Sequence, residues 1–233
     1  MTTATLIALA IGTAAMWVLI FLLMIRYRTA LWKSVPTAVL LTLVGLLSTY
    51  IWAFVEMGGF GARSFYGAVF LVPAAFILIA KLIRIPYRDL MDFCAPAECA
   101  MLIIMKYQCL VEGCCGGRVI YTSPLGVETL FPSQIVELVN AAVLVVVLML
   151  LAFHRKNRGK IYAWYLILYG ITRFVLNFFR AGNDSLLFGL KAGNIWSLIS
   201  VFIGILWLTD HKIAILKRDM GKALGENDNN CYS

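Results

Sequence analysis

Long runs of apolar residues separated by short polar segments extend along nearly the whole chain. Each run is about 20 residues long, which is the length that a helix needs to cross a bilayer. Inside lipid a helix satisfies its own backbone amides and carbonyls, so we interpret the runs as helices. The sequence predicts an all-α polytopic membrane protein with seven transmembrane helices, at residues 5–25, 35–55, 66–83, 93–111, 135–153, 161–179 and 193–209.

The two ends of the chain have different patterns. No basic residue precedes the first apolar run, and Arg26 and Arg28 follow it, so we expect a retained anchor rather than a cleaved signal peptide. The last residues are polar and end in GENDNNCYS. We therefore expect a transmembrane domain over residues 1–210 and a cytoplasmic tail over residues 211–233, with a disordered end.

Lysine and arginine residues are distributed unevenly over the connections between the runs. Fourteen lie on one side: Arg26, Arg28, Lys33, Lys81, Arg84, Arg88, Arg155, Lys156, Arg158, Lys160, Lys212, Lys217, Arg218 and Lys222. Four lie on the other: Arg63, Arg118, Arg180 and Lys191. Connections rich in Lys and Arg stay in the cytoplasm. The sequence therefore predicts an N-terminus outside and a cytoplasmic C-terminus.

Composition agrees with a membrane location. Hydrophobic residues make up 62% of the chain and charged residues 14%, whereas charged residues are about a quarter of a soluble protein. The formal net charge is +8, and basic cytoplasmic loops facing anionic lipid account for it. The cations are spread over four segments rather than gathered in one stripe. We therefore expect membrane lipids as partners, and no nucleic acid.

Cysteine spacing argues against a metal or cofactor. The six cysteines form no C-x-x-C pair and neither histidine lies near them, so we expect no metal site and no cofactor. Cys94, Cys99 and Cys109 fall in a predicted span, where we expect small packing side chains. Cys114 and Cys115 open an outward connection, where an oxidising compartment permits disulfides, and their redox state stays open.

Aromatic residues gather near the start of the sixth predicted span. This position predicts an interfacial belt rather than a cofactor site, formed by Tyr162, Trp164, Tyr165 and Tyr169. Glycines gather instead in the outward connections, at residues 57–66, 113–133 and 180–184. Glycine there allows tight turns or a close approach to a ligand, although it also serves helix packing in membranes.

Two cations, Lys106 and Arg173, fall inside predicted spans. A charge at this depth is costly and usually marks a pathway, a partner or a ligand. Each lies seven residues before an outer boundary, so both should sit about 10 Å below the outer face. Two cations at one depth need an anion between them. The candidates are Glu137 or Glu112 in a structural network, or a lipid phosphate, which suits bidentate arginine.

Five segments together resemble, in order and spacing, the prolipoprotein diacylglyceryl transferase family of bacterial membrane enzymes. The segments are Ser64-Phe-Tyr-Gly-Ala68, Asp92-Phe-Cys-Ala-Pro96, Gly113-Cys-Cys-Gly-Gly-Arg118, Phe131-Pro-Ser-Gln-Ile-Val-Glu137, and YGITRFVLNFFR from Tyr169 to Arg180. The last is the most specific. The glycine and cysteine segment is similar to the GCC-x-G-[RK] variant of a divergent branch. The resemblance covers residues 58–184, a little over half of the chain.

The resemblance implies a function and a site. Phosphatidylglycerol, or a similar anionic phospholipid, would donate a diacylglyceryl group to the lipobox cysteine thiol of an exported lipoprotein precursor, releasing glycerol phosphate. The site would open to the outer face of the bacterial cytoplasmic membrane. Catalytic roles are implied for Tyr66, Lys106 and Arg173. Substrate-binding roles are implied for Gly67, Cys109, Glu112, Gly113, Cys114, Gly117, Arg118, Gln134, Glu137, Tyr169, Asn177 and Arg180.

The chain departs from the family's pattern within this implied site. Tyr66 stands where the family has a histidine proposed as the base, and a neutral tyrosine is a poor base near pH 7. Cys109 stands for asparagine, Phe131 for histidine, Asn177 for glutamate and Lys106 for arginine. An alternative therefore stays open: a non-catalytic phospholipid-binding or accessory protein that has lost the base. A transporter is less favoured, because we find no internal repeat.

Overall fold

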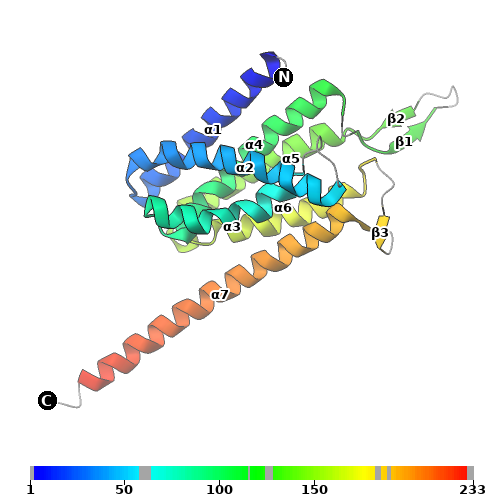
Figure 1. Ribbon diagram of the computed structural model, residues 1–233. Coiled ribbons are helices and arrows are strands. Elements are labelled where there is room, and N and C mark those ends of the chain that lie inside the picture. Colours follow the sequence, from blue (N-terminus) through cyan, green and yellow to red (C-terminus); the bar gives the residue numbers. More distant parts are fainter. Residues whose placement is uncertain are drawn as a thin grey trace.

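A computed structural model describes residues 3–57, 64–114, 116–123, 128–181, 185–187 and 190–229. Figure 1 shows the resulting bundle of long helices. The helices are α1 (Thr3–Tyr27), α2 (Ser34–Met57), α3 (Tyr66–Ile83), α4 (Tyr87–Glu112), α5 (Ser133–Phe153), α6 (Ile161–Asn177) and α7 (Ala192–Asn229), with short 3-10 turns at Leu31–Lys33 and Arg155–Asn157. The strands are β1 (Val119–Thr122), β2 (Glu128–Leu130), β3 (Ser185–Leu187) and β4 (Leu190–Lys191).

Six stretches of the described chain are long and apolar enough to cross a membrane. They are Ile7–Tyr27, Leu31–Glu56, Tyr66–Ile83, Tyr87–Glu112, Ser133–Phe153 and Ala192–Asp210. The structure therefore supports a polytopic helical membrane protein. The sixth predicted span corresponds to α6, which has 17 residues. The helix that holds the seventh predicted span, α7, continues to Asn229, into the region expected to form the cytoplasmic tail. Residues 230–233 lie outside the described part.

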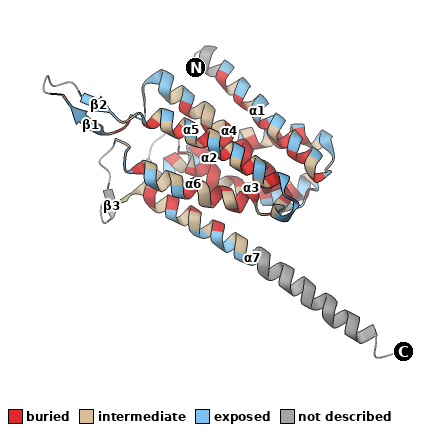
Figure 2. Ribbon diagram, turned by 180° about the vertical axis from the view of Figure 1, so that it is seen from behind, coloured by how far each residue is buried: buried red, intermediate tan, exposed pale blue. Residues whose placement is uncertain are grey.

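Figure 2 shows that the buried residues of the helices face the interior of the bundle and the exposed ones its outside. Many of the exposed residues are large and apolar. On α3, for example, Leu78 and Leu82 are 71% and 78% exposed, whereas Val72 and Phe76 are fully buried. An outer surface of this kind would be costly in water over so wide an area. Lipid acyl chains are its natural solvent, which agrees with the candidate spans.

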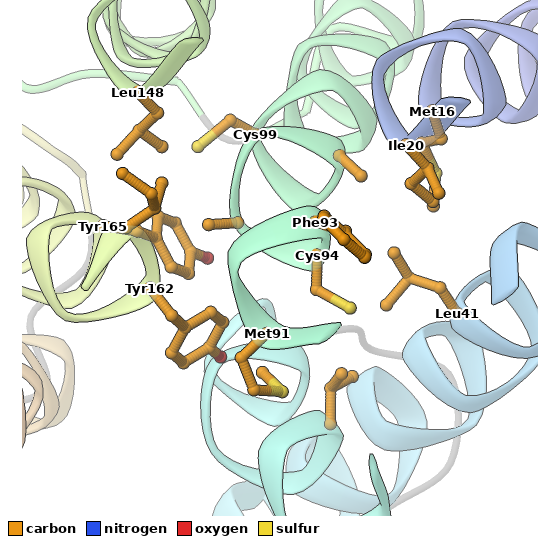
Figure 3. Close-up of a cluster of buried hydrophobic side chains, with 14 of the residues drawn as sticks. Met16, Ile20, Leu41, Met91, Phe93, Cys94, Cys99, Leu148, Tyr162 and Tyr165 are labelled. Carbon is orange, nitrogen blue, oxygen red and sulfur yellow. The ribbon is translucent and has the colours of Figure 1, made fainter. Parts of the chain in front are cut away.

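Helix α4 forms the centre of the bundle and packs against α1, α3, α5 and α6. Residues 89–100 are all buried, so this half of the helix is enclosed on every side. Figure 3 shows Phe93 and Cys94 of α4 among side chains from α1 and α2, with Tyr165 of α6 on another side. Cys94 and Cys99 are fully buried free thiols, which confirms the packing role expected of them.

Carboxylates near the start of α4 fix the start of α6. Asp92 accepts hydrogen bonds from the backbone amides of Gly159 and Ile161, at 2.5 and 2.8 Å, and from the Tyr27 hydroxyl at 2.8 Å. An anion suits this position because the amides at a helix N-terminus lack intrahelical acceptors. Arg158 contacts both carboxylate oxygens of Asp89, and this hydrogen bonding raises the pKa of Arg158. These contacts set the depth of α6.

The prediction of an interfacial aromatic belt is wrong for Tyr162 and Tyr165. Tyr162 and Tyr165 are fully buried and their rings make an edge contact, with centroids 5.3 Å apart. The Tyr162 hydroxyl donates to the carbonyl of Val69 on α3, 3.0 Å away. Amphipathic rings sit at the headgroup level only when they face lipid, and these rings face α3 and α4 instead. They therefore belong to the core.

Candidate functional site

Glu137 of α5 lies at the centre of a buried cluster of charged side chains. Its Oε2 atom is 2.5 Å from the Lys106 ammonium of α4 and 2.5 Å from a terminal guanidinium nitrogen of Arg173 on α6. Its Oε1 atom is 3.6 Å from Nε of Arg180, just after α6. The side chains of Glu137, Lys106 and Arg173 are 5%, 10% and 11% exposed. The structure thus brings the two intramembrane cations together, as their matched depth predicted.

Helix positions explain why these side chains meet. Helix α5, which carries Glu137, contacts both α4 and α6. Lys106 on α4 and Arg173 on α6 therefore approach it from two sides. Arg180 is held by the backbone that follows α6, because it pairs with Gly117 in an isolated antiparallel bridge. The amide of Arg118 also donates to the carbonyl of Phe179, at 2.9 Å. The connection after α4 therefore fixes the segment that carries Arg180.

The cluster contains more positive than negative charge. Lys106, Arg173 and Arg180 share the one carboxylate of Glu137, which leaves a formal excess of two positive charges among these four side chains. Glu112, the other acid considered from the sequence, is exposed at the end of α4. An unbalanced cation in a low-dielectric site is costly. The cluster is therefore suited to hold a further anion.

Two donors near the cluster have no hydrogen-bond partner among the residues that the structure describes. They are Nε of Arg173 and Nδ2 of Asn177, and both are buried. Buried polar groups are normally satisfied, so an unpaired donor calls for an explanation such as a ligand. A Cβ atom on Gly193 would come within 2.8 Å of Asn177 Nδ2, so Asn177 packs directly against the start of α7.

Tyr66, at the start of α3, is joined to α7. Its hydroxyl lies 2.6 Å from the Ser197 hydroxyl and donates to the carbonyl of Gly193 at 2.7 Å. The same hydroxyl interacts electrostatically with Arg173. Its ring meets the Tyr169 ring edge-on, with centroids 6.2 Å apart. Tyr66, Tyr169 and Arg173 therefore occupy one neighbourhood.

Ser197 and Gly193 were not among the residues expected from the sequence. No motif points to them, and Ser197 does not stand out from other polar residues of this span, such as Asn194 and Ser200. Ser197 is fully buried, and its hydroxyl also lies 2.7 Å from the Gly193 carbonyl.

The glycines of the implied site allow close backbone packing or a tight turn. A Cβ on Gly67 would lie 2.0 Å from the Ser48 carbonyl oxygen, so α3 and α2 touch there. A Cβ on Gly117 would lie 2.1 Å from the carbonyl oxygen of Phe131. Gly113 ends α4 with a φ of 67°, a left-handed conformation that favours glycine. Close packing and turning account for all three positions.

The remaining expected residues lie around the cluster rather than in it. Gln134 donates to the Cys114 carbonyl at 2.7 Å, which joins the start of α5 to the end of α4. Cys114 is exposed, and Cys115 lies outside the described residues. Cys109 is half-buried, and the Arg118 side chain is exposed. Within the described ranges, His, Cys, Asp and Glu side chains form no group of three that could hold a metal.

The helices and the cluster define an integral-membrane helical protein with a buried cluster of three cations around one carboxylate. The profile of one family, "prolipoprotein diacylglyceryl transferase", matches residues 6–209. The chain therefore belongs to the prolipoprotein diacylglyceryl transferase family, as its motifs indicated.

Individual relatives share modest identity with the chain. A phosphatidylglycerol–prolipoprotein diacylglyceryl transferase from Geobacter sulfurreducens is 30% identical over 171 residues, which cover 69% of this chain and 64% of the relative. A relative of the same name from Campylobacter curvus is 32% identical over 161 residues, covering 65% and 58%. Each match thus spans less than two thirds of the relative's length.

Proposed function

We propose that this protein transfers the diacylglyceryl group of phosphatidylglycerol to the lipobox cysteine thiol of an exported lipoprotein precursor. The observation that carries the proposal is the buried cluster in which Lys106, Arg173 and Arg180 share Glu137. A phosphate is the anion that fits, because guanidinium and ammonium groups in a dry site hold phosphate oxygens well. The names of the relatives supply the same donor and acceptor.

The chemistry makes the excess charge useful. The cysteine sulfur forms a bond to the terminal glycerol carbon of the diacylglyceryl group, while the bond from that carbon to the phosphate oxygen breaks. The electron pair leaves with the phosphate, so a phosphodiester with one charge becomes glycerol phosphate with two, and the thiol proton is released to solvent. Fixed cations that stabilise developing charge lower the barrier most. The excess of two matches the leaving group.

Tyr66 is then a positioning hydrogen-bond donor rather than a base. Its hydroxyl is held by Ser197 and Gly193 and sits in the field of Arg173. A neutral phenol donates a hydrogen bond readily but accepts a proton poorly near pH 7. In this proposal Tyr66 joins α3 to the start of α7 beside Arg173, because its one O–H donates to the Gly193 carbonyl.

The proposed topology places the cluster near the outer face of a bacterial cytoplasmic membrane. Seven spans are proposed, with α6 crossing as the sixth, the N-terminus outside and the C-terminus in the cytoplasm. The excess of Lys and Arg on one set of connections supports this orientation. The cluster lies at the end of α4 that leads into β1 and β2, and those strands project from the bundle (Figure 1).

A reconstituted assay tests the function. Purified protein is incubated with phosphatidylglycerol and a lipobox peptide, and released glycerol phosphate and peptide mass are measured together. We expect equal amounts of released glycerol phosphate and of peptide carrying a diacylglyceryl group. Arg173→Gln should abolish both lipid binding and transfer, whereas Lys156→Gln, which removes an exposed cation at the opposite end of the bundle, should change neither.

A second candidate, a phospholipid-binding protein without catalysis, is favoured by the contacts of Tyr66, because its hydroxyl already serves α7. Release of glycerol phosphate by wild type separates the candidates. Under transfer, wild type releases it, and Tyr66→Phe lowers this turnover while lipid binding is kept. Under binding alone, wild type releases none. If Arg173→Gln binds phosphatidylglycerol as well as wild type does, both candidates are wrong.

A further inference from the structure

The cluster has more positive charge than one phosphodiester headgroup can neutralise, and it has unpaired donors that need further acceptors. A phosphodiester has one negative charge, whereas the four clustered side chains have an excess of two positive charges. Arg173 Nε and Asn177 Nδ2 are buried donors without an acceptor in the described part of the chain. A phosphomonoester dianion has three terminal oxygens and up to two charges, so it can meet both demands.

We infer that the site binds a phosphomonoester dianion more tightly than a phosphodiester monoanion. This inference rests on the proposed function and names the anion that its site prefers. Two sources share the chemistry: a lipid with a phosphomonoester headgroup, such as phosphatidic acid, and free glycerol phosphate, the leaving group of the proposed reaction.

The environment of the cluster favours discrimination by charge. Arg173 and Lys106 are about nine-tenths buried, so solvent screens them weakly. Arg180, at 24% exposed, forms the more open side. Lys191 adds another cation nearby, because its ammonium donates to the Arg180 carbonyl at 2.6 Å. Within the described cluster, Glu137 is the one acid that opposes this field.

Asn177 is the residue that sets the excess. It is buried against Gly193 at the start of α7, it lies four residues after Arg173 on α6, and its side chain is neutral. A carboxylate there would lower the excess from two to one and would remove a donor. The preference for a dianion therefore depends on an amide at position 177.

Tight binding of the dianion affects turnover. A site that prefers the dianion holds glycerol phosphate, once formed, more tightly than it holds the phosphatidylglycerol headgroup. Release of glycerol phosphate is then slower than it would be from a site with a smaller excess of positive charge. Phosphatidic acid in the membrane competes with the donor for the same cations.

A matched pair of lipids tests the preference. Phosphatidic acid and phosphatidylmethanol, with the same acyl chains, differ by one methyl group and the charge that it removes. Each competes with fluorescent phosphatidylglycerol for the full-length protein in neutral detergent micelles. We expect phosphatidic acid to compete at least about tenfold better at pH about 7.5. The ratio should shrink at pH about 5, because the second phosphate pKa is about 6.

Substitutions at position 177 test whether the excess positive charge of the cluster causes the preference for a dianion. Asn177→Asp, close in size, should abolish the preference, whereas Asn177→Ala, which removes the donor without adding charge, should keep most of it. If Asn177→Asp does not fold, Arg180→Gln at the more exposed side also lowers the excess by one and should reduce the preference. Free glycerol phosphate serves as a separate competitor: displacement by it extends the preference to the free anion, and displacement by phosphatidic acid alone restricts it to lipids.

The outcomes separate this inference from the function on which it rests. Equal competition by the two lipids, abolished for both by Arg173→Gln, overturns the preference and leaves the phosphate site intact. Competition that Arg173→Gln does not weaken overturns the site itself, and with it the proposed function. A tenfold preference that Asn177→Asp retains shows that the charge of the cluster is not its origin, and the inference is wrong.

Discussion

Replacing Glu137 with Gln should destabilise the protein strongly. The variant keeps the size of the side chain and removes the one negative charge that three cations share. At an effective dielectric constant of about 20, unit charges about 4 Å apart attract by roughly 4 kcal/mol. Desolvation offsets part of this attraction for both near partners. Removing one member of a buried ion pair typically costs about 3–5 kcal/mol, and we expect a loss in that range.

Thermal unfolding in neutral detergent measures the loss. For a chain of this size each 1 kcal/mol corresponds to roughly 2–4 °C, so Tm should fall by roughly 6–20 °C. Phosphatidylglycerol should then raise the Tm of Glu137→Gln more than that of wild type, because the phosphate replaces the missing carboxylate. Glu112→Gln is the matched control, since that exposed acid on α4 should change stability by less than about 0.5 kcal/mol.

The reasoning fails if Glu137→Gln unfolds within about 1 kcal/mol of wild type in the absence of anionic lipid. The cations would then be solvated or paired elsewhere, and the excess of two could not be used as an argument for a phosphate.

Three further changes test the scaffold by the same unfolding measurement. Asp92→Asn should cost about 1–3 kcal/mol, because an amide donor would face the backbone donors of Gly159 and Ile161; an unchanged Tm contradicts the capping role. Gly67→Ala should cost about 1–3 kcal/mol, since the new methyl group would overlap the backbone of α2; a neutral result means that α2 and α3 separate freely. Glu98→Met should raise stability by about 1–3 kcal/mol, because neither oxygen of this buried carboxyl has a hydrogen-bond partner within the described ranges; a fall in Tm contradicts this expectation.

Hydrophobic patterning predicted most of the fold because lipid imposes one rule on every span. A helix of sufficient length satisfies its backbone, and nothing else does so within a lipid-exposed segment. The predicted ends of the helices were less accurate than the predicted spans. Helix α4 begins at Tyr87 rather than Phe93, because Asp89 and Asp92 lowered the apparent hydropathy while making buried contacts with Arg158 and the start of α6.

The charged site was predictable in part. Lys106 and Arg173 stand out in the sequence because cations are rare inside spans, and the structure pairs both with Glu137. Their common depth follows from helix rise alone. The choice of Glu137 over Glu112 did not follow, because it depends on which face of α5 meets α4. Ser197 and Gly193 gave no signal, since a buried serine in a span usually bonds to its own helix.

Contacts at the opposite end of the bundle hold the site together. Arg173 lies 12 residues after Ile161, so about 18 Å of helix separates it from the amides that Asp92 caps. A one-residue shift in the start of α6 would rotate Arg173 by about 100° around the helix axis and move it away from Glu137. The Asp92 cap and the contact of Asp89 with Arg158 therefore do more than stabilise a helix end. They select the rotation of α6 at which Arg173 and Lys106 meet on one carboxylate.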